Sequence, residues 1–194
     1  MASAFGFRPS RKIGGAPHAL AATAYRKENG KQGAMFKGDP VKLNSGYIEI
    51  ADNGDKVLGA IAGFAYIDPT SKEPIWTDNI AASVSSQGAI DGIEDVVVYV
   101  YDDPDMIYKV AARTSLAVTA GDVGTVFDVS AGSGNSITGQ SGYSINASTT
   151  VGAGMVRITG LNQGDPSYVA GTSGQVIEAQ FINRLYDQYT ADGS

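Results

Sequence analysis

The sequence predicts a mainly β protein, a sandwich or barrel of many short antiparallel strands with an extended N-terminal arm. After residue 33, short runs rich in Val, Ile and Tyr alternate with clusters of Gly, Asp, Asn and Pro, which is typical of strands joined by turns. Glycine is frequent, with 25 among 194 residues, and charged residues are sparse at 18 %. No long amphipathic period indicates a helix, and no apolar run is long enough to span a membrane.

Residues 1–33 predict the extended basic arm, because Pro and Gly interrupt them and their few large apolar residues follow no helical period. Residues 1–42 carry eight basic and two acidic side chains, a net charge of +6, whereas the rest of the chain carries 6 basic and 18 acidic ones, a net charge of −12. A basic segment beside an acidic body is typical of an arm that docks on an acidic partner. An ordinary exposed terminus is the alternative. The charge of the body argues against nucleic acid as that partner.

The first strands are expected directly after the arm. Residues 34–43 predict a strand, a Gly-Asp-Pro turn and a second strand, and residues 47–55 predict an alternating strand that ends in a turn. Residues 57–67 form a nearly continuous apolar run, which favours a buried strand bulged at Gly59 or Gly63. The body of the protein is therefore expected to span residues 34–194.

The strongest strand pattern lies in the middle of the chain, after an irregular stretch at residues 70–92. Residues 94–101 and 106–111 are rich in β-branched and aromatic residues and flank a turn at residues 102–105. We expect a β-hairpin here. Three tyrosines would then face one another across it: Tyr99, Tyr101 and Tyr108.

The last third of the chain predicts more short strands around a long loop. The strands are expected at residues 116–118, 125–129, 143–145, 155–159 and 175–183. Residues 130–154 are rich in Ser, Gly, Asn and Thr and predict a surface loop that contains the short strand at residues 143–145. Residues 184–189 predict one final helical turn.

Catalytic chemistry finds little support in the residue types. The chain has no Cys and a single His, His18, which argues against thiolate chemistry, a histidine metal site and a Ser-His-Asp enzyme. Asp102, Asp103 and Asp105 are more typical of a polar turn than of a calcium loop. We therefore expect no enzyme, no metal and no cofactor. The three tyrosines favour cross-strand packing, although exposed aromatic rings also stack on sugars or bases.

Several short motifs, taken in their order along the chain, resemble those of small virion structural proteins of tailed bacteriophages, notably of cyanobacterial and marine phages. The motifs lie at residues 5–9, 36–43, 57–59, 63–64, 100–104, 122–124 and 139–142. Proteins of this group, where they have been placed, are capsid decoration or cement proteins. The resemblance implies a structural role and names no active residue.

From this resemblance we expect a protein that binds the outer surface of the capsid and bridges neighbouring major capsid protein subunits. The arm would make the contact, its basic residues pairing with acidic capsid groups and its apolar residues filling grooves. The expected capsid-binding residues are Phe5, Phe7, Arg8, Arg11, Lys12 and Ile13. We also expect a homo-oligomer, a trimer being favoured, that is made in the host cytoplasm and located on the virion, with no nucleic-acid or membrane partner.

Two other classes of function stay open. A tail- or fibre-associated protein would bind host glycans with an aromatic β face. A small cell-wall hydrolase would have to rely on carboxylates alone. The major shell protein fits poorly, because its fold needs a long helix that the sequence does not offer.

Overall fold

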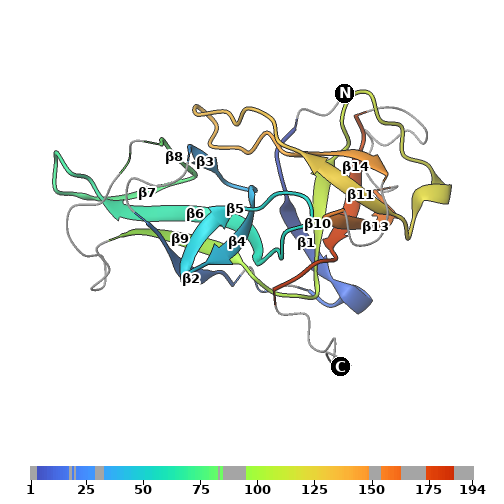
Figure 1. Cartoon of the computed structure of the whole chain (residues 1–194), viewed down its shortest axis with the longest axis horizontal. Coiled ribbons are helices and arrows are strands. Elements are labelled where there is room, and N and C mark those ends of the chain that lie inside the picture. The colour runs from blue at the N-terminus through green and yellow to red at the C-terminus, as the bar shows by residue number, and fades with distance from the viewer. Residues whose placement is uncertain are drawn as a thin grey trace.

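Strands dominate the structure, as the sequence predicted, and they form two curved sheets that lie side by side (Figure 1). The computed structural model describes residues 4–17, 19, 21–28, 33–82, 84, 95–148, 154–162 and 174–185. Each large sheet has six strands, and a third sheet has two. The described part contains no helix that is long and apolar enough to cross a membrane.

One large sheet closes into a five-stranded barrel. Its strands are β2 (Thr23–Lys27), β4 (Pro40–Asn44), β5 (Tyr47–Ile50), β6 (Gly59–Ile67) and β9 (Val96–Tyr101). Neighbours pair in the order β4-β5-β2-β9-β6, and pairing of β4 with β6 closes the ring. All pairs are antiparallel except β2 with β5, and β7 (Pro74–Thr77) extends the sheet beyond β6.

The barrel interior is filled by alternate side chains of its strands, as the period of two requires. The fully buried residues include Val41, Ile48, Ile61, Phe64 and Val98. The expected bulge in β6 is present, because the register shifts between Ile61 and Gly63. Gly59 starts the same strand where a Cβ would collide with the Tyr101 carbonyl oxygen, so that only glycine fits there.

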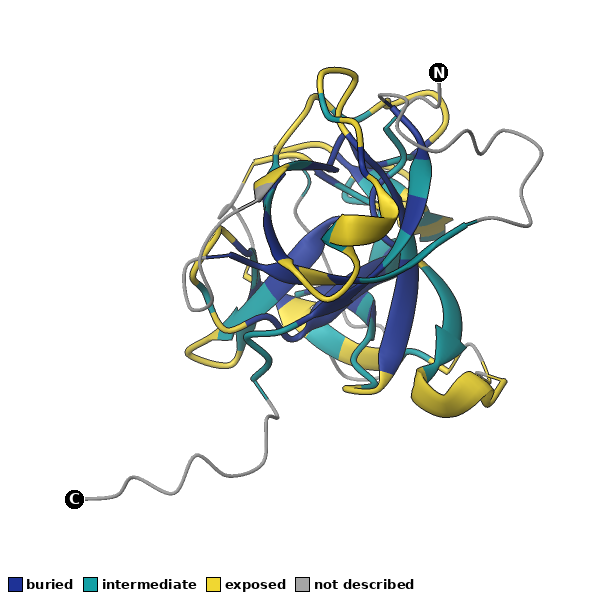
Figure 2. Cartoon of the chain, turned by 90° about the vertical axis from the view of Figure 1, so that its right-hand side faces the viewer, coloured by how far each residue is buried: buried dark blue, intermediate teal, exposed yellow. Residues whose placement is uncertain are grey.

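The second large sheet is entirely antiparallel and curls around its own core. Its strands, in order, are β1 (Arg8–Lys12), β10 (Met106–Ala111), β14 (Val176–Phe181), β13 (Val156–Leu161), β11 (Val126–Ser130) and β12 (Ser144–Ser148). A bridge between Ala112 and Ile145 brings β12 back to the end of β10. Figure 2 shows the buried residues on the strands and the exposed ones mostly on the loops and short helices.

Four short elements complete the described chain. Strands β3 (Met35–Phe36) and β8 (Asn79–Ile80) pair with each other, and 3-10 turns occur at Ile13–Gly15 and Ala120–Asp122. The predicted strands at residues 125–129, 143–145, 155–159 and 175–183 correspond to β11, β12, β13 and β14 within a few residues. Residues 116–118 form no strand, and most of the predicted turn at residues 184–189 lies outside the described residues.

The expected hairpin of residues 94–101 and 106–111 is wrong. Strand β9 pairs with β2 and β6 in the barrel, whereas β10 pairs with β1 and β14 in the other sheet. The turn at residues 102–105 is therefore a corner through which the chain passes from one sheet to the next. Tyr108 points into the second core, where its hydroxyl donates to the Tyr101 carbonyl at 2.8 Å, so the three tyrosines share no face.

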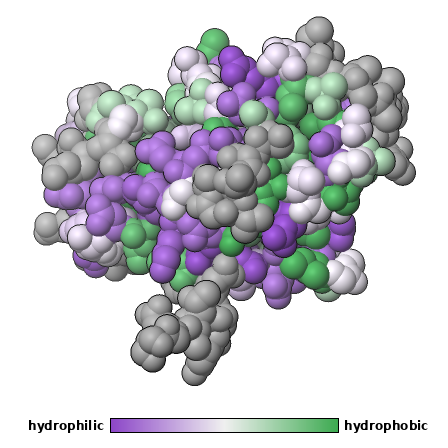
Figure 3. All heavy atoms as spheres, turned by 45° about the vertical axis from the view of Figure 1, so that its right-hand side comes forward, coloured by the Kyte–Doolittle hydropathy of each residue, from purple (hydrophilic) through white to green (hydrophobic). Residues whose placement is uncertain are grey.

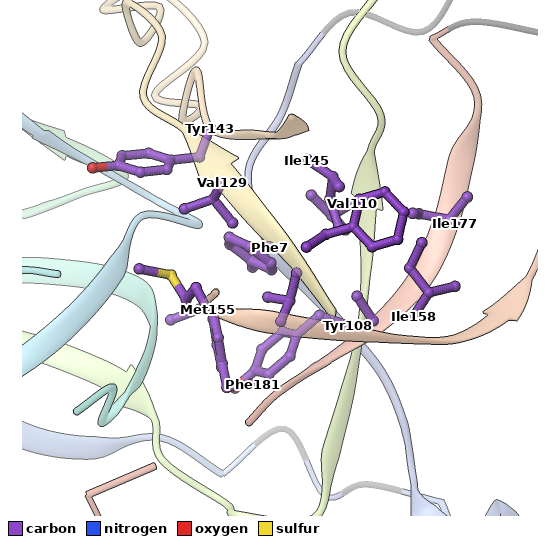
Figure 4. Packing of buried hydrophobic residues seen from close by; sticks show 14 of the residues in the cluster. Phe7, Tyr108, Val110, Val129, Tyr143, Ile145, Met155, Ile158, Ile177 and Phe181 are labelled. Atoms are coloured by element: carbon purple, nitrogen blue, oxygen red, sulfur yellow. The ribbon is translucent and has the colours of Figure 1, made fainter. Parts of the chain in front are cut away.

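The free N-terminal arm is not confirmed either. The segment is extended, but β1 is an edge strand of one sheet and β2 is a barrel strand. Phe7 is only 1 % exposed, and its ring lies 4.7 Å from that of Phe181 and 6.0 Å from that of Tyr108 (Figure 4). An apolar side chain in an extended segment can fill the protein's own core as well as a partner's groove, and here it fills its own.

A turn between β5 and β6 of the barrel joins the two large sheets through hydrogen bonds. Asn53 lies in the predicted turn at residues 52–55, and its side chain pairs with the Val129 backbone of β11 as a strand would. The Asn53 amide nitrogen donates to the Val129 carbonyl, and the Val129 amide donates to the Asn53 side-chain oxygen, both at 2.9 Å. The Asn183 side chain also donates to the carbonyls of Gly54 and Asp55. The two sheets are thus joined by specific hydrogen bonds as well as by apolar packing.

We expect Phe7→Ala to lower the free energy of unfolding by about 3–5 kcal/mol, because it empties the centre of the second core. Phe5→Ala, two residues away and only half-buried, is the matched control and should cost much less. Denaturant unfolding followed by circular dichroism measures both. Equal and small losses of stability in both variants would show instead that the N-terminal segment does not pack into the core.

Deletion of residues 1–33 removes two strands, β1 and β2, and should therefore abolish the folded state.

Candidate functional site

Three segments that are far apart in sequence meet at one junction between the two sheets. We call the contact of residues 5–7, 36–39 and 139–141 the three-segment junction. The Phe7 amide donates to the Gly38 carbonyl at 2.8 Å, and the Ser141 amide donates to the Lys37 carbonyl at 3.0 Å. Gly6 has a φ of +73°, and a Cβ there would collide with Ser141 and with the Gly38 carbonyl. Only glycine permits this approach.

A buried carboxyl group lies in the junction. Asp39 is 3 % exposed, and one of its oxygens accepts the Phe36 amide at 2.8 Å. Burial raises the pKa of Asp39 to about 6, even though hydrogen bonds from Ser141 and Phe36 favour the charged form. The sequence identified this residue only as part of a Gly-Asp-Pro turn. Nothing in a single sequence indicates that a turn carboxylate will be covered by a loop 100 residues later.

An aromatic groove runs along the outside of the barrel toward the junction. It consists of two adjoining hollows of about 470 and 350 Å³, and both are lined by Asp78 and Tyr101. The first hollow is also lined by Ala22, Ala62, Gly63, Phe64, Trp76, Thr77 and Tyr99. The second is also lined by Phe5, Phe7, Arg8, Pro9, Lys37, Gly38, Ile61, Thr138 and Gln140. Both volumes lie in the range of small-molecule sites, about 300–1,000 Å³.

Two stacked aromatic rings border the first hollow. Trp76 on β7 and Tyr99 on β9 lie on opposite sides of β6, with their centroids 5.7 Å apart and their planes inclined by 23°. The intervening strand places small residues next to both rings, Gly63 opposite Tyr99 and Ala65 opposite Trp76. Trp76 is 65 % exposed, which is unusual for the largest apolar side chain. An exposed, oriented ring of this kind is typical of a binding surface.

Charged groups lie where the two hollows meet. The Lys37 ammonium donates to both carboxylate oxygens of Asp78, at 3.1 and 3.3 Å. At the far end, the Arg8 guanidinium lies 4.5 Å from the centre of the Phe5 ring. The groove therefore offers both hydrogen-bond donors and acceptors beside its aromatic surface.

A second exposed feature projects beside the groove. Within the loop at residues 131–142, residues 135–140 form a tight turn that is closed by a bridge between Asn135 and Gln140. At its tip Ile137 is 94 % exposed. On the face drawn in Figure 3, hydrophobic residues (green) are interspersed with hydrophilic ones (purple) rather than gathered in one sheet-wide patch. Ile137 is thus a large apolar side chain that an ordered loop exposes to solvent, which makes it a candidate contact residue.

The six expected capsid-binding residues lie in different environments. Phe7 is in the core, and Phe5 and Arg8 stack on each other in the groove. Arg11 donates two hydrogen bonds to Glu178, and Lys12 pairs with Asp103, whose hydrogen bond raises the pKa of the lysine. Ile13 is 51 % exposed. The structure thus directs most of these side chains inward or to partners in the same chain.

The aspartate turn at residues 102–105 also has internal partners. Asp102 accepts the Tyr25 hydroxyl at 2.7 Å, Asp103 pairs with Lys12, and Asp105 lies 4.0 Å from Arg184. Across the part of the chain that the structure describes, no three Asp, Glu, His or Cys side chains are grouped as metal ligands. His18 lies outside the described residues.

Comparison with known proteins returned no match among family models, curated proteins or solved structures.

We expect Asp39→Asn to remove a pH dependence of stability. Because burial raises the pKa of Asp39 from 3.8 to about 6, the folded state binds this proton more tightly than the unfolded state does. The contribution of Asp39 to stability is therefore greatest below pH 4 and falls by about 3 kcal/mol as the pH rises through 6. Unfolding measured from pH 4 to 7 should show the variant gaining stability relative to the parent as the pH rises.

The exposed carboxylate of Asp105 provides the control, since Asp105→Asn should show no comparable gain over that range. A constant difference between Asp39→Asn and the parent from pH 4 to 7 would contradict the assignment.

Proposed function

We propose that this protein is a capsid decoration, or cement, protein of a tailed bacteriophage. It binds the outer surface of the head and bridges neighbouring major capsid protein subunits, and it works by adhesion rather than by catalysis. The order of the motifs along the chain supports this proposal. The structural observation that carries it is Ile137, an aliphatic side chain that is 94 % exposed at the tip of an ordered loop.

The loop holds Ile137 in a fixed position. The Asn135 side-chain oxygen accepts the amides of Ile137 and Thr138, at 2.9 and 3.1 Å, and the Asn135 carbonyl accepts the Gly139 amide at 2.8 Å. A tip that is already ordered loses little conformational entropy on docking. Burial of the isoleucine in a partner's groove contributes roughly 1.5–3 kcal/mol.

The base of the loop is fixed to the barrel half. The Lys37 amide donates to the Gly139 carbonyl at 3.1 Å. Gly134 lies so close to the Phe36 ring that a Cβ would collide with it, and Gly139 lies equally close to Asp78. Because the loop leads into β12 of the second sheet and rests on Phe36, Lys37 and Asp78 next to the barrel, a load on its tip is shared by both parts of the protein. A cement protein needs this property to hold neighbouring subunits together.

We therefore propose that the folded body, rather than a free arm, makes the main contact with the capsid. Arg11 and Lys12 already have partners in the same chain, whereas Ile13 beside them is 51 % exposed and remains an apolar candidate for the contact. We propose that several such weak contacts add up through a homo-oligomer, a trimer being favoured, on the repeating lattice of the virion surface.

Co-sedimentation with undecorated mature heads, in low and high salt, tests the proposal. We expect saturable binding at a fixed ratio to the shell subunit. Ile137→Ser should weaken this binding by about tenfold to a hundredfold, because it removes the buried apolar surface without touching the core. Val123→Ser, at a side chain that is 44 % exposed on another loop, is the matched control and should bind like the parent.

Absence of binding at both salt concentrations would overturn the capsid role. Full binding by a folded Ile137→Ser variant would show instead that the loop tip is not the contact.

A further inference from the structure

We propose that the aromatic groove binds a neutral oligosaccharide, with a sugar ring stacked on Trp76 and Tyr99. This role is additional to capsid attachment and does not depend on it. The first hollow lies on the barrel exterior, where β6, β7 and β9 form its floor. Ile137 lines neither hollow, although its neighbour Thr138 lines the second. Such a site would give the protein a ligand of its own.

The aromatic surface matches the apolar face of a pyranose ring. The Trp76 and Tyr99 rings are stacked on each other, with centroids 5.7 Å apart and planes inclined by 23°, so Tyr99 holds the exposed Trp76 ring in one orientation for a sugar to stack on. Trp76 is 65 % exposed, although an apolar ring of this size is normally covered. Tyr101 lines both hollows and continues the aromatic lining from the first hollow into the second.

The polar groups are suited to sugar hydroxyls, which donate and accept hydrogen bonds. Asp78 is an acceptor that lines both hollows, and Lys37 is a donor held beside it at 3.1 Å. Thr138 and Gln140 add hydroxyl and amide groups along the second hollow. Aromatic surface with a few oriented polar groups is the usual composition of a ligand site.

The length and charge of the groove favour a chain of neutral sugars over other classes of ligand. Two hollows that meet at Asp78 and Tyr101 form an elongated site, which favours a chain of sugars over a single one. Nucleic acid also stacks on aromatic rings, but its phosphates would approach a carboxylate on a protein with a net charge of −6. The many polar groups make a purely apolar ligand unfavourable.

The groove can be altered without disturbing the core. Trp76 and Tyr99 lie outside the barrel, on the opposite side from Val98 and Val100. Gly63 has an ordinary backbone conformation, and an added Cβ would lie 3.4 Å from the Thr77 carbonyl oxygen, which is normal contact. Gly63→Ala therefore raises the floor of the first hollow while keeping the fold.

Fluorescence offers a direct test, because Trp76 is the only tryptophan in the chain. We would titrate the full-length protein with maltohexaose, cellohexaose and chitohexaose and confirm any binding by calorimetry. We expect a saturable change in Trp76 emission with at least one of them. Tyr99→Ala should weaken that binding by about tenfold, which corresponds to the loss of one stacking contact. Gly63→Ala should also weaken it.

Two control variants separate this role from head binding. Ile137→Ser should bind the oligosaccharide like the parent, whereas Trp76→Ala, followed by calorimetry, should lose binding but still co-sediment with heads. Absence of saturable binding with all three oligosaccharides would overturn the proposal. So would saturable binding of oligodeoxythymidylate alone, or a folded Tyr99→Ala variant that binds as tightly as the parent. Since head binding is measured separately, failure of either role is distinguishable from failure of the other.

Discussion

The close backbone contact at the three-segment junction is the constraint on which the rest of the structure depends. Gly6, Gly38 and Ser141 come from distant parts of the chain, and two positive-φ glycines let their backbones approach to hydrogen-bond distance. This contact places the N-terminal strand on the second sheet, sets the loop at residues 131–142 on the barrel and covers Asp39. It also forms one end of the aromatic groove, since Gly38 and Phe7 line the second hollow. Fold, buried charge and both proposed contact surfaces therefore meet in one place.

Local pattern was enough to predict most of the strands but not how they pair. Val96–Tyr101 and Met106–Ala111 are strands in the structure as in the prediction, because β-branched and aromatic residues favour extended backbone. The turn between them has the composition of a hairpin turn, yet the same residues also suit a corner between sheets. The choice was decided by β2 and β6, which flank β9 and whose paired residues lie more than 30 positions away from their β9 partners in sequence. Pairing of this kind is settled by long-range packing, which a single sequence does not display.

The candidate surfaces were harder to predict for related reasons. Phe7 was recognised as an unusual apolar residue in a basic segment, but the partner that covers it is the protein itself. Trp76 lies in a stretch that looked irregular, because β7 is only four residues long. Ile137 lies in the stretch at residues 130–154, which was predicted to be a surface loop with a short strand at residues 143–145. A lone large aliphatic residue among small polar ones was the available signal. Stacking by the tyrosines stays a prediction: Tyr99 and Tyr101 line the groove, whereas Tyr108 is buried.

We propose that a folded two-sheet body, rather than a detached arm, attaches this protein to a phage head. Cryo-electron microscopy of heads incubated with the purified protein tests it most directly. The account predicts additional density on the outer surface into which both sheets fit, with the loop tip at Ile137 against the shell and residues 8–12 packed in the sheet. Density in which the N-terminal segment leaves the body and runs across the shell, or heads with no added density, would contradict it.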